Sequence, residues 1–413
     1  MSYELLSKLF YKDQDIFDSE YKKRKENPYT TVSLGLEIHG HEAFYVSIPE
    51  FTAITSRLYK KLSELNKLCI ELPQVAYESY ERKCLIDEII LSNDIEGVRS
   101  TRREITTVLE GNKDSPKKKR FEGMVWKYVL LLDDSTHSYM ISLKNSRDIR
   151  TLYDEIVLDE IEPANHPDGE IFRKDLAEVI SGTQQVKHTG VYPESNIIQQ
   201  IDKTLALFNR DDIPVFCKIA ILHYMIGYIH PFYDGNGRLS RFISSYLLKQ
   251  EFNTLIALRL SYMIKNNKSD YYKAFDIAND PHNMGDLTPF ILYFSEVIER
   301  AEDSLIERLR EGKEILQMYI ELLEAKYCDL DPAARKKTLD VLWYLVQNQL
   351  FSNERMDRKT LADLLKTSTV TVHNYVDALI HSGAPIREYK DGKKYVYELD
   401  MNALLEYLKA NSL

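Results

Sequence analysis

Apolar residues recur at helical spacing, i, i+3, i+4 and i+7, along most of the chain. This pattern predicts a mainly α protein. Alternating, β-branched and aromatic residues favour strands in only three places, at 29–48, 185–192 and 385–399. In the first of these, two such runs flank His39-Gly-His41, which predicts a β-hairpin.

Two helices are predicted on either side of a short loop in the centre of the chain. Val215 to Ile229 is a nearly continuous apolar run, and Pro231 should end that helix at His230. Helical spacing resumes from Leu239, so Gly235-Asn-Gly237 should form the turn that begins the next helix. Such a turn points free backbone N–H groups toward an anion, and the helix dipole adds to the attraction.

The pattern from Leu287 to Tyr327 predicts a long amphipathic helix or a pair of helices, with Gly312 as the candidate break. Asp329-Leu-Asp-Pro332 is typical of a helix stop followed by a new start. The lysine-rich stretch 112–120 is a predicted exposed connection. We therefore expect an N-terminal region, a central core, a helical linker and a C-terminal domain, at 1–115, 116–300, 301–330 and 331–413.

Composition and charge exclude several classes of protein. The formal net charge of −10 over 413 residues gives no general attraction to nucleic acid or to an anionic membrane. No segment approaches ~20 uninterrupted apolar residues, and the N-terminus lacks a signal-peptide pattern. The widely spaced Cys69, Cys84, Cys217 and Cys328 lie on apolar helix faces, as expected for core thiols in a reducing compartment. We therefore expect a cytoplasmic protein without membrane association.

The chemistry of the chain is concentrated in His230-Pro-Phe-Tyr-Asp-Gly-Asn-Gly-Arg-Leu-Ser-Arg241. His230 offers a proton acceptor that works near neutral pH, and Asp234 offers an oxygen ligand for a hard cation. Arg238 and Arg241 lie three residues apart, so both guanidinium groups can face one phosphate chain. The alternative is an ordinary helix-loop-helix with a packed histidine and two surface arginines. We favour a nucleotide site, because so many suitable groups converge on one turn.

This segment resembles the signature of the Fic (Fic/Doc) family, His-x-Phe-x-Asp/Glu-Gly-Asn-Gly-Arg-x-x-Arg, at every fixed position. The likeness extends over roughly residues 85–300. Family members mostly transfer AMP from ATP to a hydroxyl side chain of a protein and release pyrophosphate. The resemblance therefore implies a helical Fic core with a small β-hairpin flap, ATP as substrate and Mg²⁺ as cofactor.

The resemblance also implies a role for each residue of the segment. His230 would be the general base that accepts the proton of the target hydroxyl, and Phe232 would anchor the loop. Asp234 would bind the Mg²⁺ that bridges the α- and β-phosphates. Gly235, Asn236 and Gly237 would form the anion hole, Arg238 would hold the inner phosphates, and Arg241 would fix the γ-phosphate.

Two neighbouring stretches extend the resemblance. Val186, Lys187, His188, Thr189, Gly190 and Val191 would form the flap that holds the target segment by strand addition, although their pattern alone indicates only a hairpin. Tyr272 and Asn279 would line the adenine and ribose pocket in the family's closing segment. The sequence departs from the family pattern there by a short insertion, Asp280 to Met284.

Leu91-Ser-Asn-Asp-Ile-Glu-Gly97 carries a second signal. Ser92 and Glu96 are four residues apart on one face of a predicted helix, and Gly97 can close that helix. Alone, this would be a solvated acidic helix end with a glycine cap. It resembles, however, the Ser/Thr-x-x-x-Glu-Gly/Asn inhibitory motif of class II Fic proteins, which carry an N-terminal inhibitory helix. The resemblance implies that Glu96 pairs with Arg241 and keeps it from the γ-phosphate; in some relatives this glutamate also orients water for AMP removal.

The C-terminal residues predict helices at 337–347, 358–365 and 368–382, then a hairpin that turns at Asp391-Gly392. This order resembles a winged-helix domain, which often binds DNA. Bases would be read by Thr371, His373 and Asn374, and phosphates would be met by Arg387, Lys390, Lys393 and Lys394. Because 368–382 contains no Lys or Arg, we rank DNA binding behind protein docking or homodimer formation.

Three functions stay open at this point. The favoured one is a self-inhibited protein adenylyltransferase that modifies a Tyr, Ser or Thr hydroxyl of a target protein or of itself. A DNA-bound regulator that uses the Fic fold as a nucleotide sensor would not require both His230 and Asp234. A third function keeps the fold but transfers another nucleotide or phosphate group.

Overall fold

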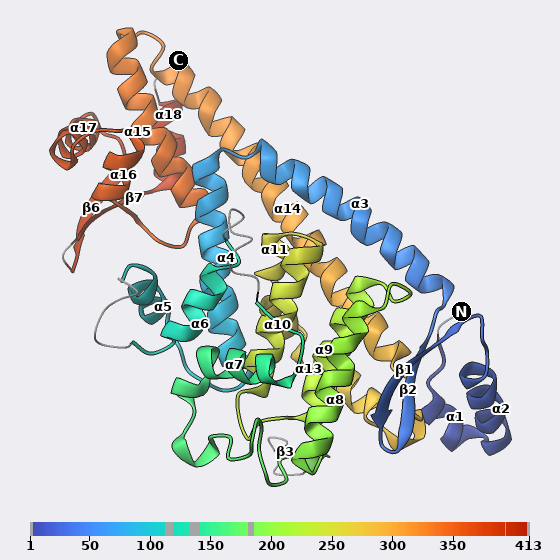
Figure 1. Ribbon diagram of the computed structural model, residues 1–413. Coiled ribbons are helices and arrows are strands. Elements are labelled where there is room, and N and C mark those ends of the chain that lie inside the picture. Colours follow the sequence, from blue (N-terminus) through green and yellow to red (C-terminus); the bar gives the residue numbers. More distant parts are fainter. Residues whose placement is uncertain (1–2, 112–118, 133–140, 181–185, 393, 411–413) are drawn as a thin grey trace. The chain divides into compact units, whose positions relative to one another are not determined.

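The computed structural model describes residues 3–111, 119–132, 141–180, 186–392 and 394–410. It is mainly helical, as the sequence predicts (Figure 1). The chain divides into two compact units, of which unit 1 comprises Met1–Ser63 and Leu85–Asp303, and unit 2 comprises Glu64–Cys84 and Ser304–Leu413. Of the residues used in the predictions above, 112–118, Gln185 and Lys393 lie outside the described residues.

Three long helices contribute residues to both units: α3 (Pro49–Glu71), α4 (Gln74–Ile95) and α14 (Thr288–Lys326). Helix α14 runs through Gly312 without interruption, so of the two predicted alternatives the single long helix is confirmed. A Cβ atom on Gly312 would lie 2.6 Å from Cζ of the Phe351 ring. The glycine therefore makes room for a neighbouring aromatic side chain.

Unit 1 begins with two short helices and a hairpin: α1 (Leu6–Lys12), α2 (Gln14–Lys25), β1 (Thr31–Ile38) and β2 (His41–Val46). Strands β1 and β2 pair antiparallel, which confirms the predicted hairpin. Its turn has positive φ at both His39 (50°) and Gly40 (78°), as a type I′ turn requires. The side chain of Asp13 accepts hydrogen bonds from the first turn of α2 and so caps that helix.

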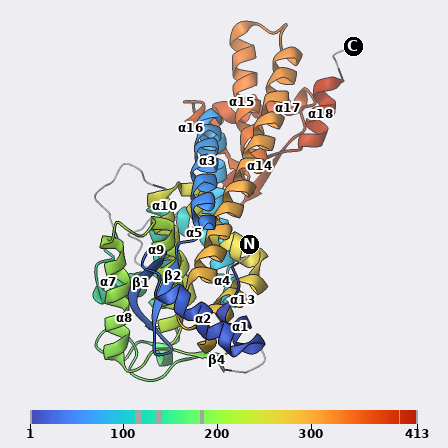
Figure 2. The same ribbon diagram turned by 90° about the vertical axis from the view of Figure 1, so that its right-hand side faces the viewer.

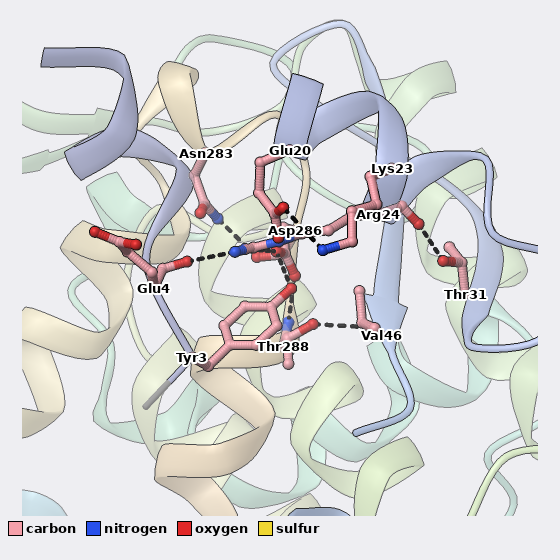
Figure 3. A network of polar contacts seen from close by, with 10 residues as sticks. All are labelled: Tyr3, Glu4, Glu20, Lys23, Arg24, Thr31, Val46, Asn283, Asp286 and Thr288. Carbon is pink, nitrogen blue, oxygen red and sulfur yellow. Dashed lines mark hydrogen bonds and ion pairs between the residues drawn. The ribbon is translucent and has the colours of Figure 1, made fainter. Parts of the chain in front are cut away.

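A buried carboxylate ties this N-terminal segment to the start of α14 (Figure 3). Asp286 is fully buried, accepts a 2.6 Å hydrogen bond from the Tyr3 hydroxyl, and lies 3.4 Å from Nη1 of Arg24. The backbone N–H of Thr288 donates to the other carboxylate oxygen at 2.9 Å. Burial raises the pKa of Asp286, although these donors and Arg24 oppose the shift. The first residues of the chain thus close over a segment near the end of unit 1.

The centre of unit 1 is a group of packed helices, α8 (Glu194–Ala206), α9 (Val215–Ile229) and α10 (Asn236–Glu251). Helix α9 has the predicted bounds and is buried almost all round, as its apolar sequence requires. It packs against both α8 and α10, and hairpin strand β1 lies beside α8 (Figure 2). This arrangement holds the α9–α10 loop at one end of a rigid helix pair.

The remaining elements of unit 1 surround these helices. The helices are α5 (Arg102–Leu109), α6 (Glu122–Val129), α7 (Ser146–Ile156), α11 (Thr254–Ala257), α12 (Leu260–Asn266) and α13 (Lys268–Ala278). Strands β3 (Glu178–Ile180) and β4 (Val186–Thr189) pair antiparallel, with Val179 opposite His188. The predicted strand at 185–192 therefore contains β4.

Unit 2 contains a small antiparallel sheet and further helices. The elements are α15 (Pro332–Phe351), β5 (Met356–Asp357), α16 (Arg358–Leu364), α17 (Thr369–His381), β6 (Ile386–Asp391), β7 (Lys394–Leu399) and α18 (Met401–Lys409), with strand order β5-β7-β6. Cys328 is exposed, so the expectation of a core thiol is wrong there, whereas Cys84 and Cys217 are buried. Within the described residues, every helix is too short or too polar to cross a membrane.

Candidate active site

The sequence motif 230–241 folds into the loop between α9 and α10 and the first turns of α10. His230 is the C-cap of α9 in the left-handed region (φ 51°), and its N–H donates to Ile226 O at 3.0 Å. Pro231 then prevents the helix from continuing. Gly235 is the N-cap of α10 with φ 83°, a conformation that glycine adopts without strain. The two reversals turn the chain from the end of α9 into the start of α10 within a few residues.

The loop is held from inside by Phe232 and Asn236. The Phe232 ring is fully buried and stacks on Tyr153, with ring centroids 3.6 Å apart. The Asn236 side chain accepts from the Phe232 N–H at 3.0 Å and donates to the Phe232 carbonyl at 2.8 Å. The amide of Asn236 thus braces the loop, and what it offers to an anion is its backbone N–H.

The start of α10 has the features of an anion site. The first backbone bond within the helix runs from Leu239 N–H to Gly235 O, so the N–H groups of residues 236–238 precede it. Arg238 is 1 % exposed, and its Nε and Nη1 have no hydrogen-bond partner within the described residues. Burial lowers the pKa of Arg238, but an arginine remains charged at neutral pH. Buried unpaired donors are costly, and an anionic ligand would satisfy them.

Asp234 is placed to meet a cation at the edge of this site. Its side chain is 47 % exposed, and its Oδ1 lies 3.8 Å from Nη2 of Arg238. No cluster of three or more His, Cys, Asp or Glu that could hold a metal ion is found in the described part of the chain. One carboxylate nevertheless fits Mg²⁺, which commonly takes one or two protein carboxylates and completes its shell with phosphates and water.

Arg241 is fully buried, and every nitrogen of its guanidinium is bound by Ser92 on α4 or by Glu96, the residue that follows α4. Nε donates to Ser92 Oγ at 3.0 Å, Nη2 to Ser92 O at 2.8 Å, and Nη1 to Glu96 Oε1 at 2.8 Å. Burial opposes ionisation of Glu96, but the charge and hydrogen bond of Arg241 outweigh it and lower the pKa of Glu96. The structure therefore pairs Glu96 with Arg241, as the family resemblance implies, and adds Ser92 as a second partner.

Glu96 also fills space above the first turn of α10. A Cβ atom on Gly237 would overlap Glu96 Oε1, so the carboxylate lies directly over the backbone of that turn. The end of α4 holds it there: Gly97 has φ 76°, and the N–H groups of Gly97 and Val98 donate to the carbonyls of Asp94 and Asn93. This is a Schellman closure, which only a residue tolerant of positive φ completes cheaply.

Comparison with protein families identifies the helical core. Residues 143–248 match the model of the Fic/DOC family. The chain contains a Fic/DOC family domain. The matched residues include the α9–α10 loop, whereas Ser92 and Glu96 precede them.

Curated relatives align with part of this Fic domain. "Protein adenylyltransferase Fic" of Aedes aegypti is 33 % identical over 84 residues, which are 20 % of this chain and 15 % of the relative. The protein of the same name from Nematostella vectensis is 33 % identical over 87 residues, or 21 % of this chain and 18 % of the relative. The chain thus matches less than a fifth of the length of these curated relatives.

Solved Fic structures resemble the chain more broadly but at low identity. A Fic family protein from Desulfovibrio desulfuricans G20 has 16 % identity and a TM-score of 0.47, over 84 % of this chain and 96 % of that one. Fic-1, residues 134–508, from C. elegans has 20 % identity and a TM-score of 0.42, over 63 % of this chain and 76 % of that one.

His230 of the Fic domain is surrounded by residues that favour its neutral form. Burial lowers its pKa to about 4, Arg173 and His188 act in the same direction, and Glu96 opposes them. His230 is therefore an uncharged proton acceptor at neutral pH. Arg173 was not singled out in the sequence, because nothing in its local pattern marks it.

The flap residues differ in what they face. His188 is buried, and its Nε2 lies 2.5 Å from Tyr228 O, whereas Lys187 and Thr189 are exposed. Gly190 is buried, and the Val191 N–H donates to Ile229 O at 3.0 Å. For Val186 the structure describes only the backbone, within β4. The flap is thus attached by one side to the last residues of α9.

The two residues expected in the nucleoside pocket have different surroundings. Tyr272 on α13 is 44 % exposed, and the charges of Glu96 and Arg241 act on its hydroxyl. Asn279 follows α13, and its Oδ1 accepts a 2.6 Å hydrogen bond from the buried Tyr224 hydroxyl. Tyr272 is therefore partly exposed and near Glu96 and Arg241, whereas the side-chain oxygen of Asn279 is already bound by Tyr224 of α9.

Glu88 on α4 is a second residue, besides Arg173, that the sequence analysis did not single out. Glu88 precedes Ser92 by one helical turn, is fully buried, and accepts hydrogen bonds from the Ser261 N–H and hydroxyl at 2.8 and 2.6 Å. Burial raises its pKa to about 7 despite these donors. A glutamate within the apolar run of residues 85–90 is the sequence signal that could have found it. Glu88 anchors α4 to the start of α12.

Proposed function

We propose that this protein is a self-inhibited protein adenylyltransferase that transfers AMP from ATP to a Tyr, Ser or Thr hydroxyl of a target protein or of itself. The observation that carries the proposal is the buried Arg238 at the start of α10, whose Nε and Nη1 have no hydrogen-bond partner within the described residues. Arg238 follows His230 in the same loop and first helical turn. These groups belong to a Fic/DOC domain whose curated relatives are named protein adenylyltransferases.

In this mechanism the target hydroxyl oxygen forms a bond to the α-phosphorus, and the bond from that phosphorus to the bridging oxygen breaks, releasing pyrophosphate. His230 accepts the hydroxyl proton. Arg238 and the N–H groups of 236–238 face the phosphate charge that develops during transfer. Asp234 would hold Mg²⁺, which, when bound, neutralises phosphate charge and orients the leaving group.

The low proton affinity of His230 suits the state before ATP binds. A histidine with a pKa of about 4 is neutral but weakly basic at pH 7. A bound triphosphate brings several negative charges close to the ring, and nearby negative charge stabilises imidazolium. Substrate binding should therefore raise the proton affinity of His230 when the proton must be accepted.

Glu96 would act as the brake in this scheme. Its carboxylate neutralises Arg241, which is then not available to the γ-phosphate, and it places negative charge over the first turn of α10. ATP would bind in an unproductive pose while this pair persists. When the brake is released, Glu96 would be the candidate to orient water for removal of AMP.

The test is mass spectrometry of the purified protein after incubation with ATP and Mg²⁺. Four proteins are compared: wild type, Glu96→Gly, Glu96→Gly/His230→Ala and the control Asp94→Asn. Asp94 lies on the same helix but pairs with Lys265, so its loss alters charge without touching Arg241. We expect added AMP in Glu96→Gly and little in the other three. No added nucleotide in any sample, with GTP and CTP as alternative donors, would refute the proposal.

For the C-terminal elements of unit 2, we propose a winged helix that docks another protein or a second copy of this chain. Arg358 of α16 lies 3.3 Å from Nδ1 of His373 on α17 and is already paired, since it donates to Tyr397 and to Glu388. Arg355 likewise lies 3.2 Å from Glu398. Paired arginines offer less to DNA phosphates, which argues against the nucleotide-sensing DNA regulator. A salt-dependent shift of duplex DNA by the purified protein would reverse this ranking.

A further inference from the structure

Arg173 is a fully buried arginine whose hydrogen bonds, in the described part of the chain, all go to backbone carbonyls. Nε donates to His230 O at 2.8 Å, Nη1 to Asp175 O at 2.5 Å, and Nη2 to Val191 O at 2.8 Å and Ile229 O at 3.3 Å. A buried guanidinium without a carboxylate partner is uncommon and costly. The position of this buried charge, against the loop that carries His230, therefore needs a physical reason.

The carbonyls explain how the charge is accommodated. Ile229 and His230 end α9, where carbonyls lack partners within the helix and the helix dipole is negative. Arg173 satisfies two of these groups and places its charge at the favourable end of the dipole. The guanidinium therefore caps the helix that presents His230.

The same guanidinium reaches the flap. Val191 O accepts from Nη2, while the Val191 N–H donates to Ile229 O at 3.0 Å, so both backbone groups of Val191 are tied to this cluster. A Cβ atom on Gly190 would overlap Nη2 of Arg173 and approach Ile229 O to 2.9 Å and His230 Cβ to 3.0 Å. The flap can approach this closely only because residue 190 is a glycine.

We propose that Arg173 is a positioning residue that joins the flap to the loop carrying His230, so that target strand and general base are held as one unit. It does not touch the reacting atoms. This inference rests on the proposed function in treating His230 as the base and the flap as the target-binding strand. Its structural content, the coupling of Val191 to His230 through one guanidinium, can be measured without activity.

Arg173 also acts electrostatically on His230. The groups that face the ring are Arg173 and His188, which lower its pKa, and Glu96 and the backbone of Gly227, which raise it, in addition to burial. Removing the Arg173 charge takes away one of the lowering contributions. The pKa of His230 should then rise from about 4 toward its ordinary value of 6.5.

The experiment compares Arg173→Gln and Arg173→Lys with Arg24→Gln, all in the full chain carrying Glu96→Gly. Arg24 is a matched control because it is also buried and donates to a backbone carbonyl, Glu4 O at 2.8 Å, within the separate Asp286 network (Figure 3). Lysine keeps the charge but not the fork that reaches several carbonyls. The measurements are NMR titration of His230, assigned with His230→Ala, amide exchange at Val191, and the KM and kcat of AMP transfer.

In Arg173→Gln we expect a raised His230 pKa, faster exchange at Val191, and at least tenfold slower transfer with little change in KM for ATP. Arg173→Lys should keep the low His230 pKa but show the faster exchange. The proposal is overturned if Arg173→Gln matches Arg24→Gln in all three measurements. If Arg173→Gln does not fold, amide exchange at Val191 in Arg173→Lys decides: faster exchange supports the proposal, and unchanged exchange overturns it. Altered titration and exchange without transfer in the parent protein would uphold the coupling and refute the enzyme.

Discussion

Replacing Glu96 by glycine is the sharpest test of the brake, because the structure shows what each atom contributes. The substitution removes the carboxylate from Nη1 of Arg241 and leaves the two bonds from Nε and Nη2 to Ser92 intact. Arg241 should therefore stay in place with one nitrogen free. The first turn of α10 also loses the negative charge that lies over Gly237.

The expected rate change in Glu96→Gly follows from the loss of one charge-assisted hydrogen bond, between Glu96 and Arg241. Such a bond contributes about 1.5–3 kcal/mol, which corresponds to about 10- to 100-fold in an equilibrium. The Glu96 side chain is 31 % exposed, so solvent screening favours the lower half of that range. We expect Glu96→Gly to raise the rate of AMP transfer about 10- to 30-fold. Glu96→Gln keeps a hydrogen-bond acceptor but not the charge, so its rate of AMP transfer should lie between those of wild type and Glu96→Gly.

Transfer is measured with ATP labelled at the α-phosphate, and ATP affinity is measured separately by calorimetry. We expect the control Asp94→Asn to transfer AMP at the wild-type rate, because the partner of Asp94 is Lys265. Equal rates for wild type and Glu96→Gly would refute the proposed brake. An equal increase of the transfer rate in Asp94→Asn would also refute it, because the increase would then come from removing any negative charge in this region rather than from releasing Arg241.

The pH dependence of the brake follows from the lowered pKa of Glu96. A carboxylate with a depressed pKa keeps its interaction above its ordinary value of 4.5 and loses it as the pH falls through the lower folded value. Glu96 is therefore ionised at every pH from 8 to 5. The ratio of the Glu96→Gly rate to the wild-type rate should stay constant over that range, and a ratio that falls toward 1 by pH 5 would show that the pair is weaker than the structure indicates.

Three further predictions concern single residues. In the Glu96→Gly background, His230→Ala should slow transfer by about 10²–10⁴-fold while ATP affinity by calorimetry changes little; retained transfer would remove His230 from its role as the base. Gly312→Ala should destabilise unit 2 by about 1–3 kcal/mol, because its Cβ would lie 2.6 Å from the buried Phe351 ring. Urea unfolding checks this, and a stabilised variant would mean that the ring moves aside and helix propensity prevails. The raised pKa of Glu88, about 7 against an ordinary 4.5, means that the folded protein binds the extra proton, so stability should fall as the pH rises through this interval. Glu88→Gln should flatten the dependence of the melting temperature between pH 5 and 7, and parallel curves for the two proteins would contradict the assignment.

Local signals predicted the helix pair and its loop because each boundary depends on one or two nearby residues. Proline after His230 and glycine at 235 act through their own backbone conformations, so the bounds of α9 and the start of α10 could be read from the chain. At Gly312 the same local rule left a helix break open as an alternative, and the structure has a continuous helix there because the glycine accommodates Phe351. A glycine that provides space for a distant side chain cannot be told from a helix end in sequence alone.

Within the site, the family motif indicated which residues lie together but not what all their atoms do. Asn236 was grouped with the anion hole, yet its side chain braces Phe232 from both sides. Glu88 and Arg173 had no motif to mark them, since Glu88 binds the distant Ser261 and Arg173 binds the distant carbonyl of His230. Such contacts depend on packing between segments, which periodicity and spacing do not report.

The order of residues predicted a mainly helical protein, the α9–α10 loop with its histidine, aspartate and arginines, and a second motif that contains Glu96. These features are local, because they follow from backbone preferences and from residues a few positions apart. Packing alone shows that Ser92 and Glu96 bind all three nitrogens of Arg241 and that Arg238 is buried with unpaired donors in the described part of the chain. It also shows that Arg173 donates to the carbonyls of both His230 and Val191. These features depend on burial, which raises the free-energy cost of an unpaired charge. Burial in turn arises only when segments far apart in the sequence pack together.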